Sequence, residues 1–262
     1  MNEIVKQFEA EKKARIEAFG KDIEFQKRSR DWLEESMRKY YVYNFSWLGR
    51  PIIQNPIDMV AIQEIIWEVK PDLIIETGIA HGGSLIFSAS MLVLNAACGG
   101  PEDAEVLGID IDIRAHNRKA IEEHPMSKRI TMIEGSSVAP EIIAQVMEKA
   151  KGKKRILICM DSNHTHDHVL AELEAYAPLT SVGSYCVVLD TFVEDVPADV
   201  FQDRPWHPGN SPKTAVWEYL RRLEEEGRQA VDGGQLKFEI DKATEDKLLI
   251  TTAPDGYLKR VS

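Results

Sequence analysis

Residues 72–97 read DLIIETGIAHGGSLIFSASMLVLNAA and join a short apolar run to a helical pattern through a glycine-rich turn. The run at 72–76 is apolar between its two acidic ends, which is typical of a strand buried on both faces of a parallel sheet. Residues 82–97 have the composition and length of a helix. The stretch therefore predicts the first strand–turn–helix unit of an α/β fold.

The same alternation continues through the rest of the chain. Four more predicted strands, each followed by a predicted helix, fall at 105–110, 129–135, 155–161 and 184–190, with the helices at 113–124, 140–152, 168–179 and 213–227. Repeated alternation implies right-handed crossovers and a doubly wound sheet. The runs at 236–240 and 247–251 are separated by too few residues for a helical crossover, so we expect an antiparallel hairpin at one edge. The predicted fold is a doubly wound, mainly parallel, seven-stranded Rossmann-like sheet.

The N-terminal segment has a different character. Residues 2–40 are rich in Glu, Lys and Arg, with Ile4, Val5 and Phe8 close to helical spacing. We expect an N-terminal helical arm at 1–50, made of one or two amphipathic helices, before a single α/β domain at 51–262. The arm either lies against a partner subunit of a homo-oligomer or packs as a solvated helix on its own domain.

Composition limits the classes of function. The chain has 262 residues, 44% of them hydrophobic, and a net charge of −11. Such an acidic balance argues against nucleic acid as a partner. No apolar run approaches about 18 residues, so no membrane span is expected. The three cysteines form no disulfide pattern, and the charged N-terminus lacks an apolar signal region, so we expect a cytoplasmic location.

In doubly wound sheets, ligands bind beyond the carboxyl ends of the strands. At the end of the first strand, Glu76 precedes Gly78 and Gly82, and Ser84 opens the helix. This spacing departs from the dinucleotide fingerprint G-x-G-x-x-G. An acid before the first glycine suits a ligand with a cationic amine, such as the methionine part of S-adenosylmethionine. A glycine turn without a ligand is the alternative.

The next two strand ends offer contacts for a nucleoside. Asp110 ends the second strand and is placed to accept hydrogen bonds from ribose hydroxyls, whereas Asp112 fits better as a turn or cap residue. Ser136 and Ser137 follow the third strand. They are candidates for the adenine edge, but serine is also a common turn residue.

The fourth strand runs into MDSNHTHDH at 160–168, and the fifth ends at Asp190. Adjacent strand tips lie roughly 5 Å apart, so Asp161 and Asp190 are candidates to share one divalent ion, and oxygen ligands favour Mg²⁺ or Mn²⁺. His164 and His168 raise zinc as an alternative, although no cysteine completes a tetrahedral set. A third alternative is no metal, with the acids capping helices. His164 is also a candidate general base.

Three segments carry a family resemblance: ETGIAHGGS (76–84), DSNHTHDHVLAELEAYAPLTSVGSYCVV (161–188) and DRPWHPGNSPKTAVWEYL (203–220). Over roughly residues 50–252, the chain resembles the cephalosporin hydroxylase/rhamnosyl O-methyltransferase family of class I S-adenosylmethionine-dependent methyltransferases. The resemblance implies that 51–262 form a methyltransferase domain. For the cofactor it implies contacts to the methionine end from Glu76, Gly78, Gly82 and Ser84, to the ribose from Asp110 and to the adenine from Ser136. It implies Asp161 and Asp190 as metal ligands and His164 as the catalytic base. Asp161 would also be catalytic and lie beside the cofactor.

One departure concerns the metal. Macrolide-sugar members of the family have Glu-Asp at the end of the fifth strand, whereas this chain has Leu189 followed by Asp190. Either water fills the missing position, or Glu194 or Asp195 reaches in, or the metal is weak or absent.

The expected activity is O-methylation of a hydroxyl on a sugar or glycosylated metabolite, with S-adenosylmethionine as donor and Mg²⁺ or another divalent ion as a further cofactor. The ion would lower the pKa of the hydroxyl and His164 would take its proton. The loop at 203–212 is placed to cover the acceptor as a lid. One alternative is a hydroxylase that holds iron with Asp161, His164 and His168. Another is a non-catalytic cofactor-binding partner subunit.

Overall fold

Strand β3 (Leu73–Thr77) lies inside a seven-stranded sheet in the computed structural model, which describes residues 2–262. The strand order is β5-β4-β3-β6-β7-β9-β8. Strands β3 to β7 run parallel, and β8 and β9 are antiparallel additions at one edge. The strands after β3 are β4 (Glu105–Asp110), β5 (Ile130–Glu134), β6 (Ile156–Met160), β7 (Tyr185–Val188), β8 (Phe238–Ile240) and β9 (Tyr257–Arg260). The predicted doubly wound, mainly parallel sheet is confirmed.

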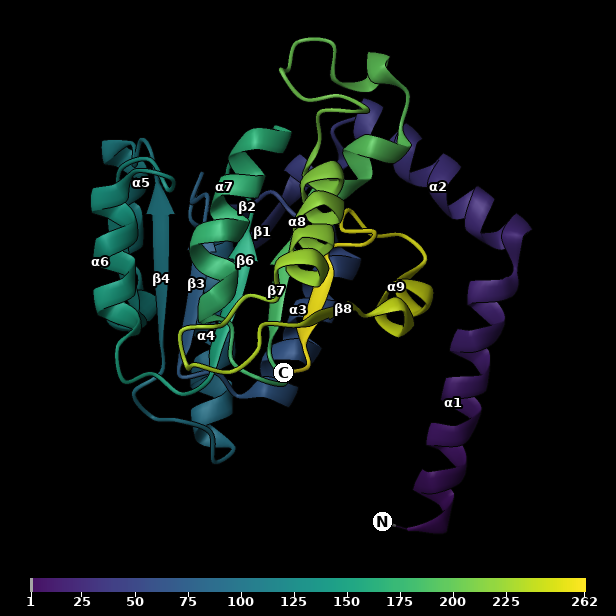
Figure 1. The fold of residues 1–262 in the computed structure, drawn as a ribbon, viewed down its shortest axis with the longest axis horizontal. Coiled ribbons are helices and arrows are strands. Elements are labelled where there is room, and N and C mark those ends of the chain that lie inside the picture. Colours follow the sequence, from purple (N-terminus) through teal and green to yellow (C-terminus); the bar gives the residue numbers. More distant parts are fainter. Residues whose placement is uncertain (1) are drawn as a thin grey trace.

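Helices cover both faces of this sheet (Figure 1). Ile74 of β3 packs into a core shared with α3 (Pro56–Val69), α4 (Gly83–Ala97) and α5 (Ala115–Glu122). Ile75 packs into the opposite core, shared with α6 (Pro140–Ala150), α7 (His166–Tyr176) and α8 (Pro212–Glu226). Successive residues of a strand point to opposite faces, so an apolar run such as LIIE supplies both cores at once.

The prediction of an antiparallel pair of strands at one edge of the sheet is confirmed, but one of the two strands was predicted in the wrong place. Residues 247–251 do not form a strand, because the first two lie in the last turn of helix α9 (Lys242–Leu248) and the other three lie in the loop that follows. The Asp241 side chain caps the helix by accepting a hydrogen bond from the Thr244 backbone N–H at 3.1 Å. The antiparallel partner of β8 is β9, with Phe238 opposite Arg260. The short turn that we expected between the two strands is therefore a helix and a loop.

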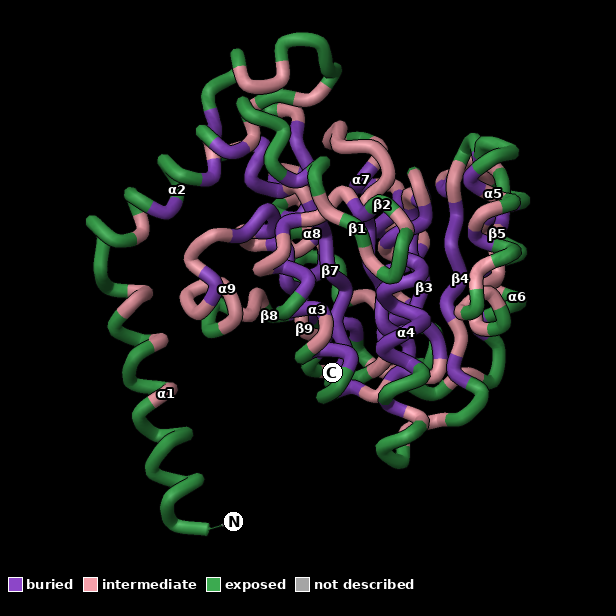
Figure 2. The backbone as a smooth tube through the Cα atoms, turned by 180° about the vertical axis from the view of Figure 1, so that it is seen from behind, coloured by how far each residue is buried: buried purple, intermediate pink, exposed green. Residues whose placement is uncertain are grey.

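The predicted N-terminal helices are α1 (Glu3–Lys21) and α2 (Ile23–Arg38). No residue of α1 is buried, and Figures 1 and 2 show its N-terminal part standing away from the body of the domain. Its C-terminal end lies beside α9, where Gly20 is next to the Asp246 side chain. Helix α2 is anchored by Leu33, which packs against Phe192 and Val193. None of the helices within residues 2–262 is long and apolar enough to cross a membrane.

A small antiparallel hairpin, β1 (Phe45–Trp47) with β2 (Arg50–Ile52), connects α2 to α3. The Trp47 ring packs edge to face on Phe87 of α4, with centroids 4.9 Å apart. The hairpin is thereby fixed beside the N-terminal half of α4. Single-turn 3-10 helices complete the chain: η1 (Tyr41–Asn44), η2 (Pro125–Arg129), η3 (Ala177–Leu179), η4 (Thr191–Asp195) and η5 (Ala198–Phe201).

Candidate functional site

The glycine turn after β3 is pressed against the end of β6. Gly78 has φ +88°, and a Cβ at this position would overlap the carbonyl oxygen of Asp161. Gly82 has φ +83° at the N-cap of α4, where a Cβ would meet the Ile121 side chain. Only glycine satisfies both requirements. The turn is thus the feature that brings the β3 and β6 loops together.

Glu76 is buried behind this turn. Its carboxylate is 3% exposed and accepts a hydrogen bond from the Ser84 hydroxyl. Burial raises the pKa of Glu76 to about 7, and the Ser84 hydrogen bond acts in the opposite direction. A cavity of about 40 Å³ lies on the other side of Ser84, lined by Gly78, Ser84, Asp161 and residues 51–54, which run from the end of β2 into the segment after it. The buried acid and the small cavity suit the amino-acid end of a ligand.

Asp110 at the tip of β4 is tied to the same turn. Its carboxylate accepts backbone N–H groups from Ile79 at 2.8 Å and Ala80 at 3.2 Å. The sequence had suggested a contact to ribose alone; the structure adds a role in shaping the turn. A carboxylate held by backbone donors is well fixed to receive a further hydroxyl.

Two residues that hold the turn were missed in the sequence. Asn117 of α5 donates to the Ala80 carbonyl at 2.9 Å, and Arg50 of β2 donates to the His81 carbonyl at 3.0 Å. Both come from elements about 30 residues or more away in the chain. The residues next to Asn117 and Arg50 in the sequence therefore gave no indication that they hold this turn.

The two serines after β5 separate in the structure. Ser137 is 5% exposed, and its hydroxyl lies 3.1 Å from Nε2 of His168 on α7. Ser136 is only half-buried. Ser136 thus remains available for an adenine edge, whereas the Ser137 hydroxyl is engaged with its neighbouring helix.

Asp161, His164 and Asp190 converge at the ends of β6 and β7. Each offers a ligand atom, and these atoms lie within 4.8 Å of one another. His164 Nε2 is 3.2 Å from Asp190 Oδ2. Asp190 has φ +56°, a left-handed backbone conformation that turns the chain directly after β7. The predicted pairing of Asp161 with Asp190 is therefore present, with His164 as a third member.

The electrostatics of the cluster fit a bound cation. Burial raises the pKa of Asp161 well above its usual range, and the charges of Asp190, Glu76 and Glu172 raise it further. Burial also raises the pKa of Asp190, while His164 lowers it. Two carboxylates this close repel one another when both are ionised, and a divalent ion removes that repulsion. A donor set of two carboxylates and one imidazole suits Mg²⁺ or Mn²⁺ and also admits Zn²⁺.

Neither acid proposed as a substitute for the missing carboxylate reaches the cluster. Glu194 accepts the Gly209 backbone N–H at 2.8 Å and the Ser211 hydroxyl at 2.7 Å. Asp195 forms an ion pair with Lys213 at 2.7 Å. These two alternatives are therefore wrong in this structure, because both side chains are used to fix the start of α8.

The set that a hydroxylase would need is not assembled. His168, predicted as a third iron ligand with Asp161 and His164, turns toward Glu172 and Ser137. It is not part of the cluster that Asp161, His164 and Asp190 form. The geometry therefore favours a site with one histidine and two carboxylates.

The loop at 203–212 lies over His164. The Trp206 ring packs edge to face on the His164 ring, with centroids 4.7 Å apart, and Arg204 sits over Trp206 at 5.2 Å. Asn210 accepts the His166 backbone N–H at 3.0 Å and fastens the loop to the start of α7. An aromatic side chain of this loop thus packs directly against the imidazole.

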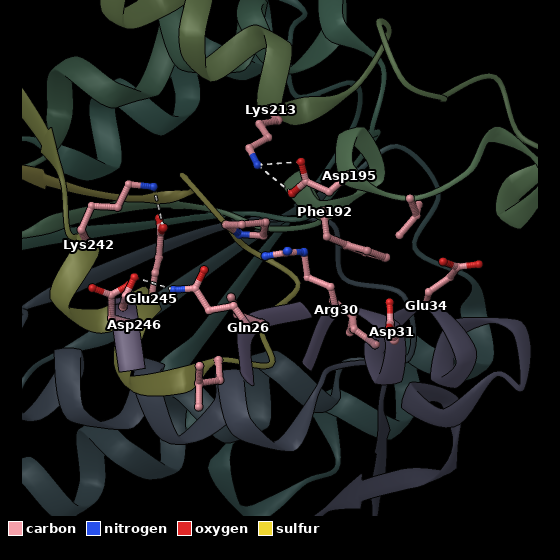
Figure 3. A pocket seen from close by; sticks show the side chains of 16 residues that line it. Gln26, Arg30, Asp31, Glu34, Phe192, Asp195, Lys213, Lys242, Glu245 and Asp246 are labelled. Atoms are coloured by element: carbon pink, nitrogen blue, oxygen red, sulfur yellow. Dashed lines mark hydrogen bonds and ion pairs between the residues drawn. The ribbon is translucent and has the colours of Figure 1, made fainter. Parts of the chain in front are cut away.

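A larger cavity, of about 680 Å³, lies elsewhere, between α2, η4 and α9 (Figure 3). In this view Lys213 reaches to Asp195 and Lys242 to Glu245, so much of the charged lining is already paired. None of the predicted donor or metal residues lines it. The smaller cavity, in contrast, is lined by three of the predicted site residues, Gly78, Ser84 and Asp161.

Comparisons with known proteins agree on one family. The family model described as "Rhamnosyl O-methyltransferase/CmcI" matches residues 39–261. A rhamnosyl O-methyltransferase of Mycobacterium leprae is 30% identical over 244 residues, which cover 89% of this chain and 93% of the relative. One of Mycobacterium tuberculosis is 30% identical over 239 residues, covering 89% and 87%.

Among solved structures, CmcI with Mg and SAM has a TM-score of 0.52 at 18% identity and covers 84% of this chain and 78% of that one. An apo structure of CmcI gives the same TM-score at 17% identity, covering 84% and 77%. At this level of identity the likeness is one of fold. With the family model matching most of the chain, the protein belongs to the rhamnosyl O-methyltransferase/CmcI family.

Proposed function

We propose that this protein is an S-adenosylmethionine-dependent O-methyltransferase acting on a hydroxyl of a sugar or glycosylated small molecule. The observation that carries the proposal is the convergence of the glycine turn with Asp161, His164 and Asp190 at one edge of the sheet. Family membership and the names of the mycobacterial relatives support the reaction and the sugar acceptor.

In this proposal S-adenosylmethionine lies across the carboxyl ends of the adjacent strands β6, β3, β4 and β5. Its amino-acid end lies by Ser84 and the cavity under Gly78, where an ionised Glu76 balances the ammonium group. Asp110 receives the ribose hydroxyls, and Ser136 borders the adenine. The backbone N–H groups at the start of α4 add donors for the carboxylate.

The acceptor lies between the donor and the loop at 203–212. Asp161 and Asp190 would hold Mg²⁺, which when bound supplies a Lewis acid that lowers the pKa of the acceptor hydroxyl. The acceptor oxygen attacks the methyl carbon in line with the carbon–sulfur bond, which breaks as the new carbon–oxygen bond forms. The hydroxyl proton passes to Nε2 of His164, and the Asp190 carboxylate at 3.2 Å stabilises the resulting imidazolium.

The proposal is tested by binding and by turnover. Calorimetry should show S-adenosylhomocysteine binding to the parent protein and at least about tenfold weaker binding to Asp110→Ala. Mass spectrometry should then show methyl transfer from S-adenosylmethionine to rhamnosides or other glycosides. Oxidation of the acceptor that depends on iron and 2-oxoglutarate would instead establish the hydroxylase alternative. Binding without turnover across acceptors would favour a non-catalytic partner subunit.

We also propose that the protein is a cytoplasmic homo-oligomer in which α1 contacts a second copy. Ile4 and Phe8 of α1 are 74% and 55% exposed, and the helix buries none of its residues on its own domain. Covering such side chains stabilises an assembly in proportion to the apolar area removed from water. The cytoplasmic location is supported by three free cysteines, two of them buried.

A further inference from the structure

A chain of four polar side chains runs beneath the candidate site. The Ser162 hydroxyl donates to Oε1 of Glu172 at 2.7 Å. His168 Nε2 lies 3.4 Å from the same oxygen and 3.1 Å from the hydroxyl of Ser137. The chain therefore joins the loop after β5 to the loop after β6 through two residues of helix α7.

Glu172 is an unusual member of a helix interior. Its side chain is 0% exposed, no Lys or Arg within residues 2–262 pairs with it, and its Oε2 atom is buried without a hydrogen-bond partner in that range. Burying a carboxylate with so few partners costs stability, and an apolar side chain of similar size often serves packing equally well. Packing alone therefore does not account for a glutamate here.

The two ends of the chain lie next to the two halves of the site. Ser162 directly follows Asp161, a member of the acidic cluster, and Ser137 directly follows Ser136, the proposed adenine neighbour. Glu172 also acts on the cluster through space, because its charge contributes to the raised pKa of Asp161. A shift of either loop would have to stretch these hydrogen bonds or move Glu172, which is held inside the packed core.

We propose that Glu172 is a positioning residue that couples the two loops, so that binding of the donor nucleoside and binding of the divalent ion reinforce each other. The inference rests on the proposed function, which places the two ligands on these loops. Such coupling is reciprocal: if the ion tightens binding of the nucleoside by some factor, the nucleoside tightens binding of the ion by the same factor.

The test measures the affinity for S-adenosylhomocysteine by calorimetry, with Mg²⁺ and with EDTA. In the parent protein Mg²⁺ should tighten binding by about fivefold or more. In Glu172→Met the ratio of the two affinities should fall close to one, while the thermal midpoint stays the same or rises. Ser162→Ala breaks the chain with less change of volume and should also reduce the ratio. It provides the test if Glu172→Met does not fold.

The matched control is Glu174→Met, the same substitution two residues along α7, where the glutamate pairs with Arg222 and Arg228 near the surface. It should keep the parent ratio. The coupling would be overturned if Mg²⁺ left the affinity of the parent protein for S-adenosylhomocysteine unchanged. It would also be overturned if Glu172→Met and Ser162→Ala both kept the ratio of affinities measured for the parent. Failure of the parent to bind S-adenosylhomocysteine under either condition would instead overturn the proposed function on which the coupling rests.

Discussion

At the scale of single residues, His164 stands between two roles. Its Nε2 faces Asp190, which allows it to complete a metal site or to receive a proton beside one. The Trp206 ring packs edge to face on the imidazole. In our account the two carboxylates are the protein ligands and the imidazole is the base.

We predict that His164→Ala lowers kcat by at least about 100-fold, because a positioned general base contributes a factor of this order. The affinity for S-adenosylhomocysteine should remain within about twofold, since the donor contacts are made by other strand ends. The matched control is His116→Ala, at an exposed position on α5. A His164→Ala variant that keeps most of the parent kcat would show that another group takes the proton.

Glu76 makes the stability of the fold depend on pH, and the direction of the effect follows from the burial of its carboxylate. Because its pKa is about 7 in the folded protein and near 4.5 when unfolded, the folded state holds the proton across that interval. The protein without ligands should therefore lose stability as the pH rises from about 4.5 to 7, by up to about 3 kcal/mol.

We predict that Glu76→Gln removes this loss, so its thermal midpoint exceeds that of the parent at pH 8 and matches it near pH 4. The same variant should bind S-adenosylhomocysteine at least about tenfold more weakly, because the ammonium group loses its carboxylate. Calorimetric scans at both pH values check the first part and titration checks the second. Equal midpoints at pH 8 would show that Glu76 is not the group responsible.

The part of the site that could not be predicted from the sequence depends on contacts between residues that are far apart in the chain. Asp161, Asp190 and the glycine turn were predictable because each stands directly after an apolar strand. Glu172 was not, because its burial is decided by how α7 lies on the sheet and its residues read as an ordinary amphipathic helix. The grouping of His164 with both carboxylates likewise depends on the turn that Asp190 makes.

At the scale of elements, the loop at 203–212 is held near its C-terminal end, and its aromatic residue, Trp206, precedes these anchors in the chain. Glu194 and Asn210 fix residues 209–211. Trp206 is packed on His164. This arrangement suits a cover that shapes the acceptor side of the site without touching the donor.

We predict that Trp206→Ala raises KM for a glycoside acceptor about tenfold, in keeping with the loss of one aromatic contact. KM for S-adenosylmethionine should be nearly unchanged. Trp67→Ala, which alters a 48% exposed tryptophan on α3, is the matched control. Steady-state kinetics with each substrate varied in turn distinguish the two outcomes; an effect on the donor KM alone would contradict the assignment of this loop to the acceptor.

The elements themselves were largely predictable, with one instructive error. Strand β6 is apolar throughout and β3 is apolar over its first three residues, as expected for a sheet that is covered on both faces. The run KLLIT at 247–251 is equally apolar, but Asp241 caps a helix that reaches Leu248 before any strand can begin. A short apolar run does not distinguish a strand from the last turn of a helix, and here the cap decides.

At the scale of the whole molecule, α1 and α2 divide the arm into two parts with different energetics. Helix α2 inserts Leu33 into a core with Phe192 and Val193, whereas α1 has an apolar side that its own domain does not cover. Helix α2 is therefore part of the folded domain. Helix α1 has surface available for another copy of the chain.

We predict that deleting residues 2–21 converts the oligomer to a monomer with little change in the stability of the remaining domain. Light scattering coupled to size exclusion measures the mass, and a thermal scan of the dissociated form measures stability. Leu33→Ala should instead destabilise the domain by about 2–4 kcal/mol through the cavity it leaves. An unchanged mass after the deletion would show that α1 does not mediate assembly.

The central claim is that donor and divalent ion meet at the ends of β3, β6 and β7. The most direct measurement is anomalous diffraction from a crystal soaked with S-adenosylhomocysteine and Mn²⁺. Our account predicts one manganese peak between the carboxylates of Asp161 and Asp190, with the nucleoside running from Ser84 to Ser136. A manganese peak away from these carboxylates, or a nucleoside bound in the cavity beneath α2, would contradict it.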